Sequence, residues 1–208
     1  LAQHKVTRGE AFRHSYVGKY LAVSHRWFAP DAPDADGKQL AKVKEHLREH
    51  PEVEWVWFDY WCMPQGKDKT PKNKVSFKHM LSNINWLYLG CSVLVLVDLS
   101  YMSRFWTQFE AWLCLQNIGP SGAMSSSNAK GGPQRCTIEP IYNANSAIVS
   151  YLRMMWAGKA PEEAHDMLAS PDVSVTNQGD KDMQLPKILT LANDVQEVLL
   201  ADGGSVVM

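Results

Sequence analysis

Short apolar runs alternate along the chain with longer segments in which apolar residues return every three or four positions. Residues 20–24, 54–60 and 93–97 have the length and composition of strands, and the last run, built only of Val and Leu, is typical of a parallel strand covered on both faces. Residues 38–50 and 76–89 show helical spacing. This order of elements predicts an α/β fold with a parallel sheet of four to five strands and flanking helices.

The hydrophobic pattern changes after residue 118. Residues 119–134, GPSGAMSSSNAKGGPQ, have almost no apolar content, which predicts a flexible insert. Residues 136–142 predict an edge strand, because Pro140 cannot donate a backbone hydrogen bond within a central ladder. Helical spacing returns in three later segments: residues 145–158, 161–168 and 185–200.

These patterns divide the chain into three parts. Residues 1–18 are polar and mixed, and we expect them to form a leader or short helix outside the core. Residues 19–160 form the predicted α/β domain, and residues 161–208 form a C-terminal helical extension whose last eight residues we expect to be disordered.

Composition narrows the functional classes. The chain has 208 residues, 45% of them hydrophobic, and a net charge of -1, so neither nucleic acid nor an anionic membrane is an expected partner. No run has the length of a transmembrane helix. Four cysteines without paired spacing predict neither a disulfide framework nor a zinc site, and they favour the cytoplasm or another reducing compartment. Loss of an organellar targeting segment before Leu1 stays an open alternative.

The strand at 93–97 leads into the segment with the strongest chemical signal. Asp98 ends the strand, Ser100 or Ser103 is placed to cap the next helix, and that helix contains one carboxylate, Glu110. Glu110 lies one turn after Trp106, at the margin of an apolar stripe, where desolvation raises the pKa of a carboxyl group. We therefore expect Glu110 to be the catalytic candidate; the alternative is that it forms an ion pair with Arg104.

Further candidates lie at the ends of the predicted strands, and Asp59, at the end of the second, is placed to contact a bound ligand. His25 and Arg26 are placed to hold a phosphate group, and three tryptophans are placed to stack on the rings of a nucleotide: Trp27, Trp61 and Trp106. The plainer alternatives are core tryptophans, a structural histidine at position 25 and an Asp59 that only caps a turn. The histidines lack the spacing of metal ligands, so we expect no metal.

Three segments, in this order, resemble the heterokaryon-incompatibility (HET) domain family. Residues 20–27, YLAVSHRW, resemble its opening strand, which brings Ser24 into the candidate site. Residues 57–65, WFDYWCMPQ, resemble a strand that ends in Trp-Ile-Asp and is followed by Cys and Gln. Residues 104–110, RFWTQFE, resemble its Arg-x-Trp-Thr-x-Gln-Glu segment, with Phe109 inserted between Gln108 and Glu110.

The last segment is also similar to the TIR domain, in which a Trp is followed four residues later by a Glu. This resemblance, which covers roughly residues 18 to 118, implies a flavodoxin-like fold, a role in cell-death signalling or innate defence, and cleavage of NAD at the nicotinamide–ribose bond by Glu110. NAD would be the substrate, with no required cofactor and with self-association or other protein subunits as partners.

Two other functions stay open on the sequence. One is a non-catalytic interaction or assembly domain, or a structural subunit of a larger complex. The other is a cysteine hydrolase in which Cys62 is the nucleophile and His25 the base. A glycine-rich phosphate loop is missing from the sequence, which disfavours a dehydrogenase.

Overall fold

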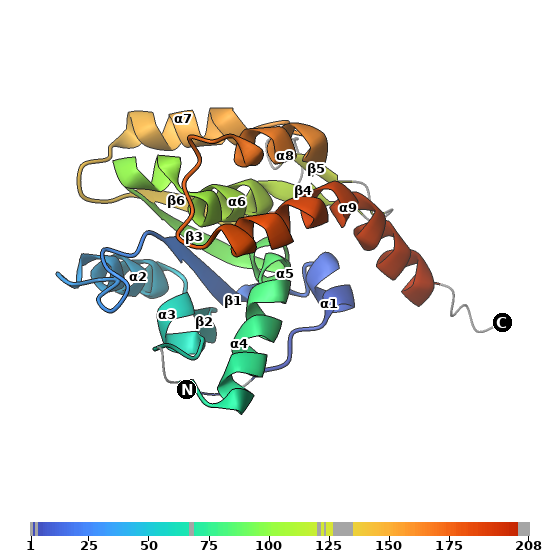
Figure 1. Ribbon diagram of the computed structural model, residues 1–208, viewed down its shortest axis with the longest axis horizontal. Helices are drawn as coiled ribbons and strands as arrows, with labels where there is room; N and C mark the ends of the chain where they lie inside the picture. Colours follow the sequence, from blue (N-terminus) through green and yellow to red (C-terminus); the bar gives the residue numbers. More distant parts are fainter. Residues whose placement is uncertain are drawn as a thin grey trace.

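A four-stranded parallel sheet forms the centre of the protein in the computed structural model, which describes residues 2, 4–66, 69–119, 122, 124–126 and 135–203 (Figure 1). β1 (Tyr16–His25) lies between β2 (Trp55–Trp57) and β3 (Cys91–Val97), and β6 (Cys136–Pro140) forms the other edge. The edge position of the Pro140 strand is as predicted. Because the strand order changes direction between β1 and β3, a crevice is expected at their carboxyl ends.

The sheet is covered by helices on both faces, as the β3 sequence predicts. On one side α2 (Lys38–Glu49) packs through Val43 against one set of alternating strand residues: Leu21, Val23, Leu94 and Leu96. On the other side α5 (Asn85–Gly90) and α6 (Phe105–Cys114) pack against the set pointing the opposite way: Ala22, Val93, Val95 and Val97. Every residue of β3 except Ser92 is buried.

Residues 54–90 contain more elements than the predicted strand at 54–60 and the predicted helix at 76–89. β2 ends at Trp57, and Asp59 opens the short helix α3 (Asp59–Cys62). The next helix, α4 (Pro71–Asn83), begins earlier than predicted because the Thr70 side chain caps it and Pro71 occupies its first turn. A break at Ile84 separates α4 from α5.

The segment after β3 begins with a 3₁₀ helix, η1 (Leu99–Ser103). Asp98 caps η1, because its Oδ1 accepts a hydrogen bond from the Tyr101 backbone N–H at 2.7 Å. α6 then begins after Arg104 without a side-chain cap. The prediction that Ser100 or Ser103 caps this helix was therefore wrong.

The N-terminal segment belongs to the core and is not a leader outside it. α1 (Arg8–Phe12) buries Ala11 and Phe12, and β1 begins at Tyr16, within the range predicted as leader. α1 packs so closely on α5 that a Cβ added to Gly90 would lie 2.7 Å from Ala11. Because α1 has only five residues and polar residues surround its buried pair, the hydrophobic periodicity of the sequence does not reveal it.

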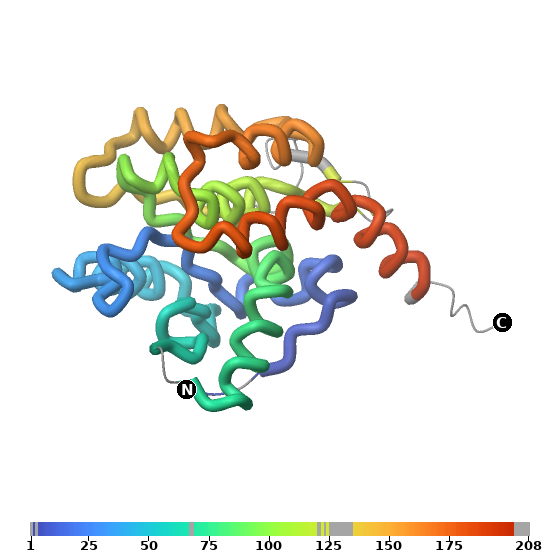
Figure 2. The backbone as a smooth tube through the Cα atoms, viewed as in Figure 1, coloured from blue at the N-terminus to red at the C-terminus, as the bar shows by residue number. Residues whose placement is uncertain are grey.

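The three predicted C-terminal helices are present as α7 (Ser146–Trp156), α8 (Pro161–Ala169) and α9 (Gln178–Gly203). α8 and α9 share one hydrophobic cluster with β3 and α6, so the predicted extension is part of the same core. Its buried apolar members include Ala164, Leu168, Ile188, Leu191 and Val195. α9 also crosses α4, where Lys187 Nζ donates to the Ser82 carbonyl at 2.6 Å. The end of α9 projects beyond the body (Figure 2).

β4 (Gln116–Ile118) and β5 (Met124–Ser126) pair antiparallel at the start of the predicted flexible insert. The strand at Met124–Ser126 differs from the prediction of a flexible insert at 119–134, of which residues 120, 121, 123 and 127–134 lie outside the described residues. Residues 201–203 of the predicted disordered tail belong to α9, and residues 204–208 lie outside the described residues. In the described part of the chain, no helix has both the length and the apolar character required to cross a membrane.

A disulfide joins Cys114, at the end of α6, to Cys136, at the start of β6, with 5.6 Å between their Cα atoms. The prediction that the cysteines form no disulfide was wrong. Spacing along the chain cannot reveal a pair that only the packing of α6 beside β6 brings together. Cys62 and Cys91 are free.

Candidate functional site

Glu110 is held at the carboxyl end of the sheet by the end of β1. Its side chain is only 6% exposed, and its Oε2 accepts a hydrogen bond from the Ser24 hydroxyl at 2.5 Å. The Tyr101 hydroxyl lies 2.7 Å from Ser24 Oγ and completes a buried chain of hydroxyl groups. Burial raises the pKa of Glu110 well above its usual value, the Ser24 hydrogen bond opposes this, and the nearby Asp59 charge adds to it.

Arg104 does not neutralise Glu110, because no ion pair joins these two residues in the described structure. Burial and the nearby Arg26 charge lower the pKa of Arg104, so two guanidinium groups lie close together. Arg26 is partly neutralised: its Nε lies 2.7 Å from Asp98 Oδ2. Glu110 is therefore surrounded by hydroxyl groups and not by a cation.

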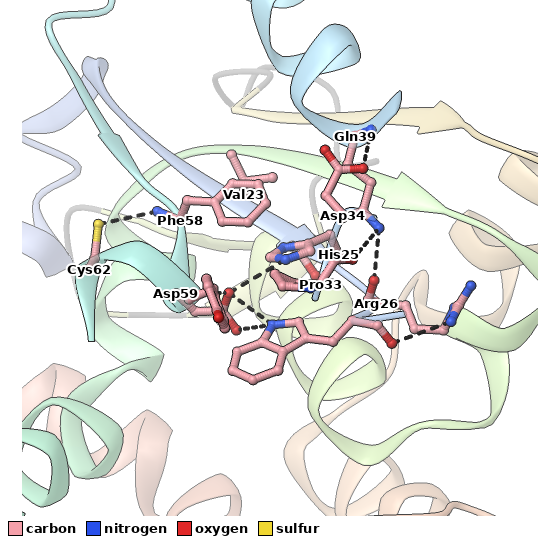
Figure 3. A network of polar contacts seen from close by, with 12 residues as sticks. Val23, His25, Arg26, Pro33, Asp34, Gln39, Phe58, Asp59 and Cys62 are labelled. Carbon is pink, nitrogen blue, oxygen red and sulfur yellow. Dashed lines mark hydrogen bonds and ion pairs between the residues drawn. The ribbon is translucent and has the colours of Figure 1, made fainter. Parts of the chain in front are cut away.

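Asp59, His25 and Trp27 form a second polar group near Glu110. Figure 3 shows the His25 and Asp59 side chains facing each other. Trp27 Nε1 donates to both carboxylate oxygens of Asp59, at 2.8 and 3.0 Å, and the Tyr60 backbone N–H donates to Oδ1 at 2.6 Å. Asp59 thus contacts the backbone of its own turn without capping α3, and it also contacts Trp27 at the end of β1. His25 Nε2 lies 3.5 Å from Asp59 Oδ1, beyond a good hydrogen bond.

Burial controls the protonation of both groups. It lowers the pKa of His25 to about 3, although a hydrogen bond with the Val23 backbone acts in the other direction. It raises the pKa of Asp59 to about 7, although the Tyr60 and Trp27 hydrogen bonds favour the ionised form. His25 is therefore neutral at physiological pH, and Asp59 titrates near it.

The loop after Trp27 is fixed by α2. Asp34 accepts hydrogen bonds from the backbone N–H groups of Gln39 and Leu40, and Gln39 Nε2 donates to the carbonyl oxygens of Arg26 and Pro33 (Figure 3). These contacts hold Arg26 and Trp27 at the end of β1 and limit how far the loop can move.

A pocket of about 540 Å³ opens at this edge of the sheet. Six of the eight predicted site residues line it: His25, Arg26, Trp27, Asp59, Trp106 and Glu110. Ser24 lies behind Glu110 and contacts it directly. Trp61 does not line the pocket; its side chain is 43% exposed and stacks on Phe58.

Part of the pocket wall comes from the C-terminal segment, which the sequence argument placed in an extension. The Phe105 backbone N–H donates to the Ser174 carbonyl at 2.8 Å, which holds residues 174–177 against the start of α6. Trp106 hydrogen-bonds to Asp180, and both line the pocket. No local pattern in the sequence marks residues 174–177, because this contact depends on how α8 and α9 fold back.

Gln108, in segment 104–110, and Cys62, in segment 57–65, both have contacts that stabilise the fold. Gln108 donates to the Met102 carbonyl and accepts from Trp156 Nε1 at 3.0 Å, which ties α6 to α7. Cys62 Sγ contacts the backbone of Phe58 and Val56, and burial raises its pKa. Because Cys62 neither lines the pocket nor has a lowered pKa, these findings give the cysteine-hydrolase alternative no support.

Within the described ranges, no three His, Cys, Asp or Glu side chains converge closely enough to hold a metal ion. We compared the chain with protein-family models, with curated proteins and with solved structures, and none of them matches it.

Proposed function

We propose that this protein is a HET/TIR-like signalling or defence domain that hydrolyses NAD at the nicotinamide–ribose bond, with Glu110 as the catalytic carboxylate. The observation that carries the proposal is the buried carboxyl group of Glu110 at the wall of a pocket, held by Ser24 at the carboxyl ends of β1 and β3. Ligands of doubly wound sheets bind at this place.

The strand order supports a flavodoxin-like assignment. Numbered along the chain, the parallel strands β1, β2, β3 and β6 have the order 2-1-3-4, which corresponds to the first four positions of the flavodoxin-like order. The resemblance of the three sequence segments fits the same assignment, because each lies where a strand meets this edge.

The chemistry requires a carboxylate that faces a developing cation. The nicotinamide of oxidised NAD leaves as a neutral ring, so the bond needs little acid catalysis, whereas the ribose acquires positive charge in the transition state. Burial raises the pKa of Glu110, and a bound pyridinium cation would favour its ionised form. A dry, preoriented carboxylate stabilises the ribose cation more strongly than a solvated one would.

The other lining groups suit the remainder of a dinucleotide. Arg26 and Arg104 provide positive charge for the two phosphates, and Trp27 and Trp106 provide flat surfaces for its rings. The volume of about 540 Å³ is within the range of small-molecule sites.

The direct test is release of nicotinamide from NAD by purified protein, compared with Glu110→Gln. We expect release by the wild type and a loss of at least about 100-fold in the variant, which keeps the size of the side chain but removes its charge. Folded wild-type protein that releases no nicotinamide, at concentrations that also allow assembly, would contradict the proposal.

A non-catalytic interaction or assembly domain is the second candidate, and one observation favours it. α7 exposes Tyr151 and Met154, whose exposed fractions are 57% and 75%. Exposed apolar residues on one helix suit contact with another protein subunit or a second copy. The interaction domain is favoured over the enzyme if Met154→Glu abolishes self-association, measured by sedimentation, and Glu110→Gln changes neither self-association nor nicotinamide release.

A further inference from the structure

His25 has a buried nitrogen without a hydrogen-bond partner. Nε2 is shielded from solvent, no described group donates to it or accepts from it within hydrogen-bond range, and the His25 side chain is 1% exposed. Asp59 Oδ1 lies 3.5 Å from it. An unsatisfied buried polar atom costs roughly 1–3 kcal/mol, so such an atom beside a pocket suggests a missing ligand group.

The missing group must be a hydrogen-bond donor. The other ring nitrogen interacts with the Val23 backbone, and the neutral imidazole then presents Nε2 as a lone pair. Ionised Asp59 can only accept hydrogen bonds, and its two oxygens are already oriented by Trp27. Two acceptors therefore face the same part of the pocket, and both line it.

A water molecule, with its two hydrogens, would satisfy both acceptors. A metal ion is a poorer occupant, because no third His, Cys, Asp or Glu converges on the pair in the described structure. The pair also lies near the proposed catalytic group, since the Asp59 charge contributes to the raised pKa of Glu110. Water bound between His25 and Asp59 would therefore lie in the same pocket as Glu110, the carboxylate proposed to stabilise the ribose.

We propose that Asp59 is the general base for the water that attacks the ribose, and that His25 is a positioning residue whose Nε2 accepts the second hydrogen of that water. This inference rests on the proposed NAD hydrolysis. As the C1′–N bond breaks, its electron pair leaves with neutral nicotinamide. The water oxygen then bonds to C1′, and the water proton passes to Asp59, giving ADP-ribose.

The surroundings of Asp59 favour this role near neutral pH. It is faced by Glu110 on α6, Tyr88 on α5, Cys62 on α3, and His25 and Trp27 at the end of β1. None of these is a cation, so desolvation dominates and its pKa of about 7 matches the working pH of an efficient general base.

The experiment separates bond cleavage from water attack. Labelled nicotinamide is incubated with NAD and protein, and two products are measured: labelled NAD, formed when nicotinamide returns to C1′, and ADP-ribose, formed when water attacks. Exchange requires no proton transfer from the nucleophile, so only hydrolysis needs the proposed base.

For Asp59→Asn we expect hydrolysis to fall about 100-fold or more while exchange stays within about threefold of the wild type. His25→Phe, which keeps a ring but removes the acceptor, should lower the ratio of hydrolysis to exchange about 10-fold, and His25→Gln should restore part of it. Wild-type hydrolysis should rise with pH through about 7 and level off above it as Asp59 loses its proton, and Asp59→Asn should lack this rise. The control Asp166→Asn changes an exposed carboxylate on α8 and should match the wild type.

Equal losses of exchange and hydrolysis in folded Asp59→Asn protein, or no loss of either, would overturn the inference and leave the proposed function intact. Asp59→Glu provides a second reading if the Asn variant is poorly folded, because it keeps a carboxylate and should retain measurable hydrolysis. A wild type that shows neither product would overturn the proposed function, and this inference with it.

Discussion

Ser24 Oγ lies 2.5 Å from Glu110 Oε2, so a single buried hydrogen bond joins the end of β1 to the middle of α6 across 86 residues of sequence. This contact orients the carboxyl group of the proposed catalytic residue. It also makes Glu110 part of the core, so the group should influence stability as well as catalysis.

Glu110→Gln should change how stability depends on pH. The folded-state pKa of Glu110 is raised, so above about pH 4.5 the folded state binds more protons than the unfolded state, and the free energy of unfolding falls as pH rises. The variant lacks this loss, so its stability relative to the wild type should increase between pH 5 and 8, by up to about 1.4 kcal/mol per pH unit. Urea unfolding at several pH values measures it, with exposed Glu162→Gln as the control. A constant difference across the range would contradict the raised pKa.

His14→Asn should have the opposite pH signature. Burial and the Arg135 charge lower the pKa of His14 to about 4, so between about pH 6.5 and 4 the unfolded state binds the extra proton and stability falls as the pH falls. Asn suits the positive φ of 56° at this position, although the Ile118 N–H loses its acceptor. The variant should be less stable at pH 7 but less sensitive to acid; exposed His79→Asn should keep the wild-type sensitivity.

The sequence predicts those features of the fold and of the candidate site that depend on the local pattern of apolar and polar residues. The Val and Leu run of β3 indicates a strand buried on both faces, and the position of Glu110 at the margin of an apolar stripe indicates a desolvated carboxylate; both features are present. Features that depend on distant packing are not predictable in this way. Phe12 is buried only because α1 meets α5, and the Ser174 carbonyl reaches Phe105 only because α9 folds back. The Cys114–Cys136 pair belongs to the same class.

Removing the disulfide should destabilise the protein. The bond joins residues 22 positions apart, and a loop of that length corresponds to about 3 kcal/mol in the chain-entropy account. The double variant Cys114→Ser, Cys136→Ser should therefore unfold at a lower urea concentration than the wild type, and reduction of the wild type should give a similar shift. Cys62→Ser changes a free cysteine, so reductant should lower its unfolding midpoint by the same amount as that of the wild type. Equal stability of reduced and oxidised wild type would show that the bond does not form in solution.

Gly90→Ala should disrupt the contact between α1 and α5. A Cβ at residue 90 would lie 2.7 Å from the Cα, Cβ and carbonyl oxygen of Ala11, and backbone cannot move aside as a side chain can. We expect a loss of about 1–3 kcal/mol in the free energy of unfolding. Gly179→Ala is the matched control, because its Cβ would meet only the Asn177 side chain at 3.4 Å. Similar stability of the two variants would indicate that α1 is not packed as described.

Arg104→Ala should weaken substrate binding without slowing the chemical step. Arg104 lines the pocket beside Arg26 and forms no ion pair in the described structure, so its charge is available to a phosphate. Loss of a charge-assisted hydrogen bond should raise the KM for NAD about 10-fold, with kcat nearly unchanged. Nicotinamide riboside, which has no phosphate, should be cleaved equally by the variant and the wild type. Exposed Arg48→Ala controls for a general loss of positive charge. A lower kcat with an unchanged KM would mean instead that Arg104 orients Glu110 or the start of α6.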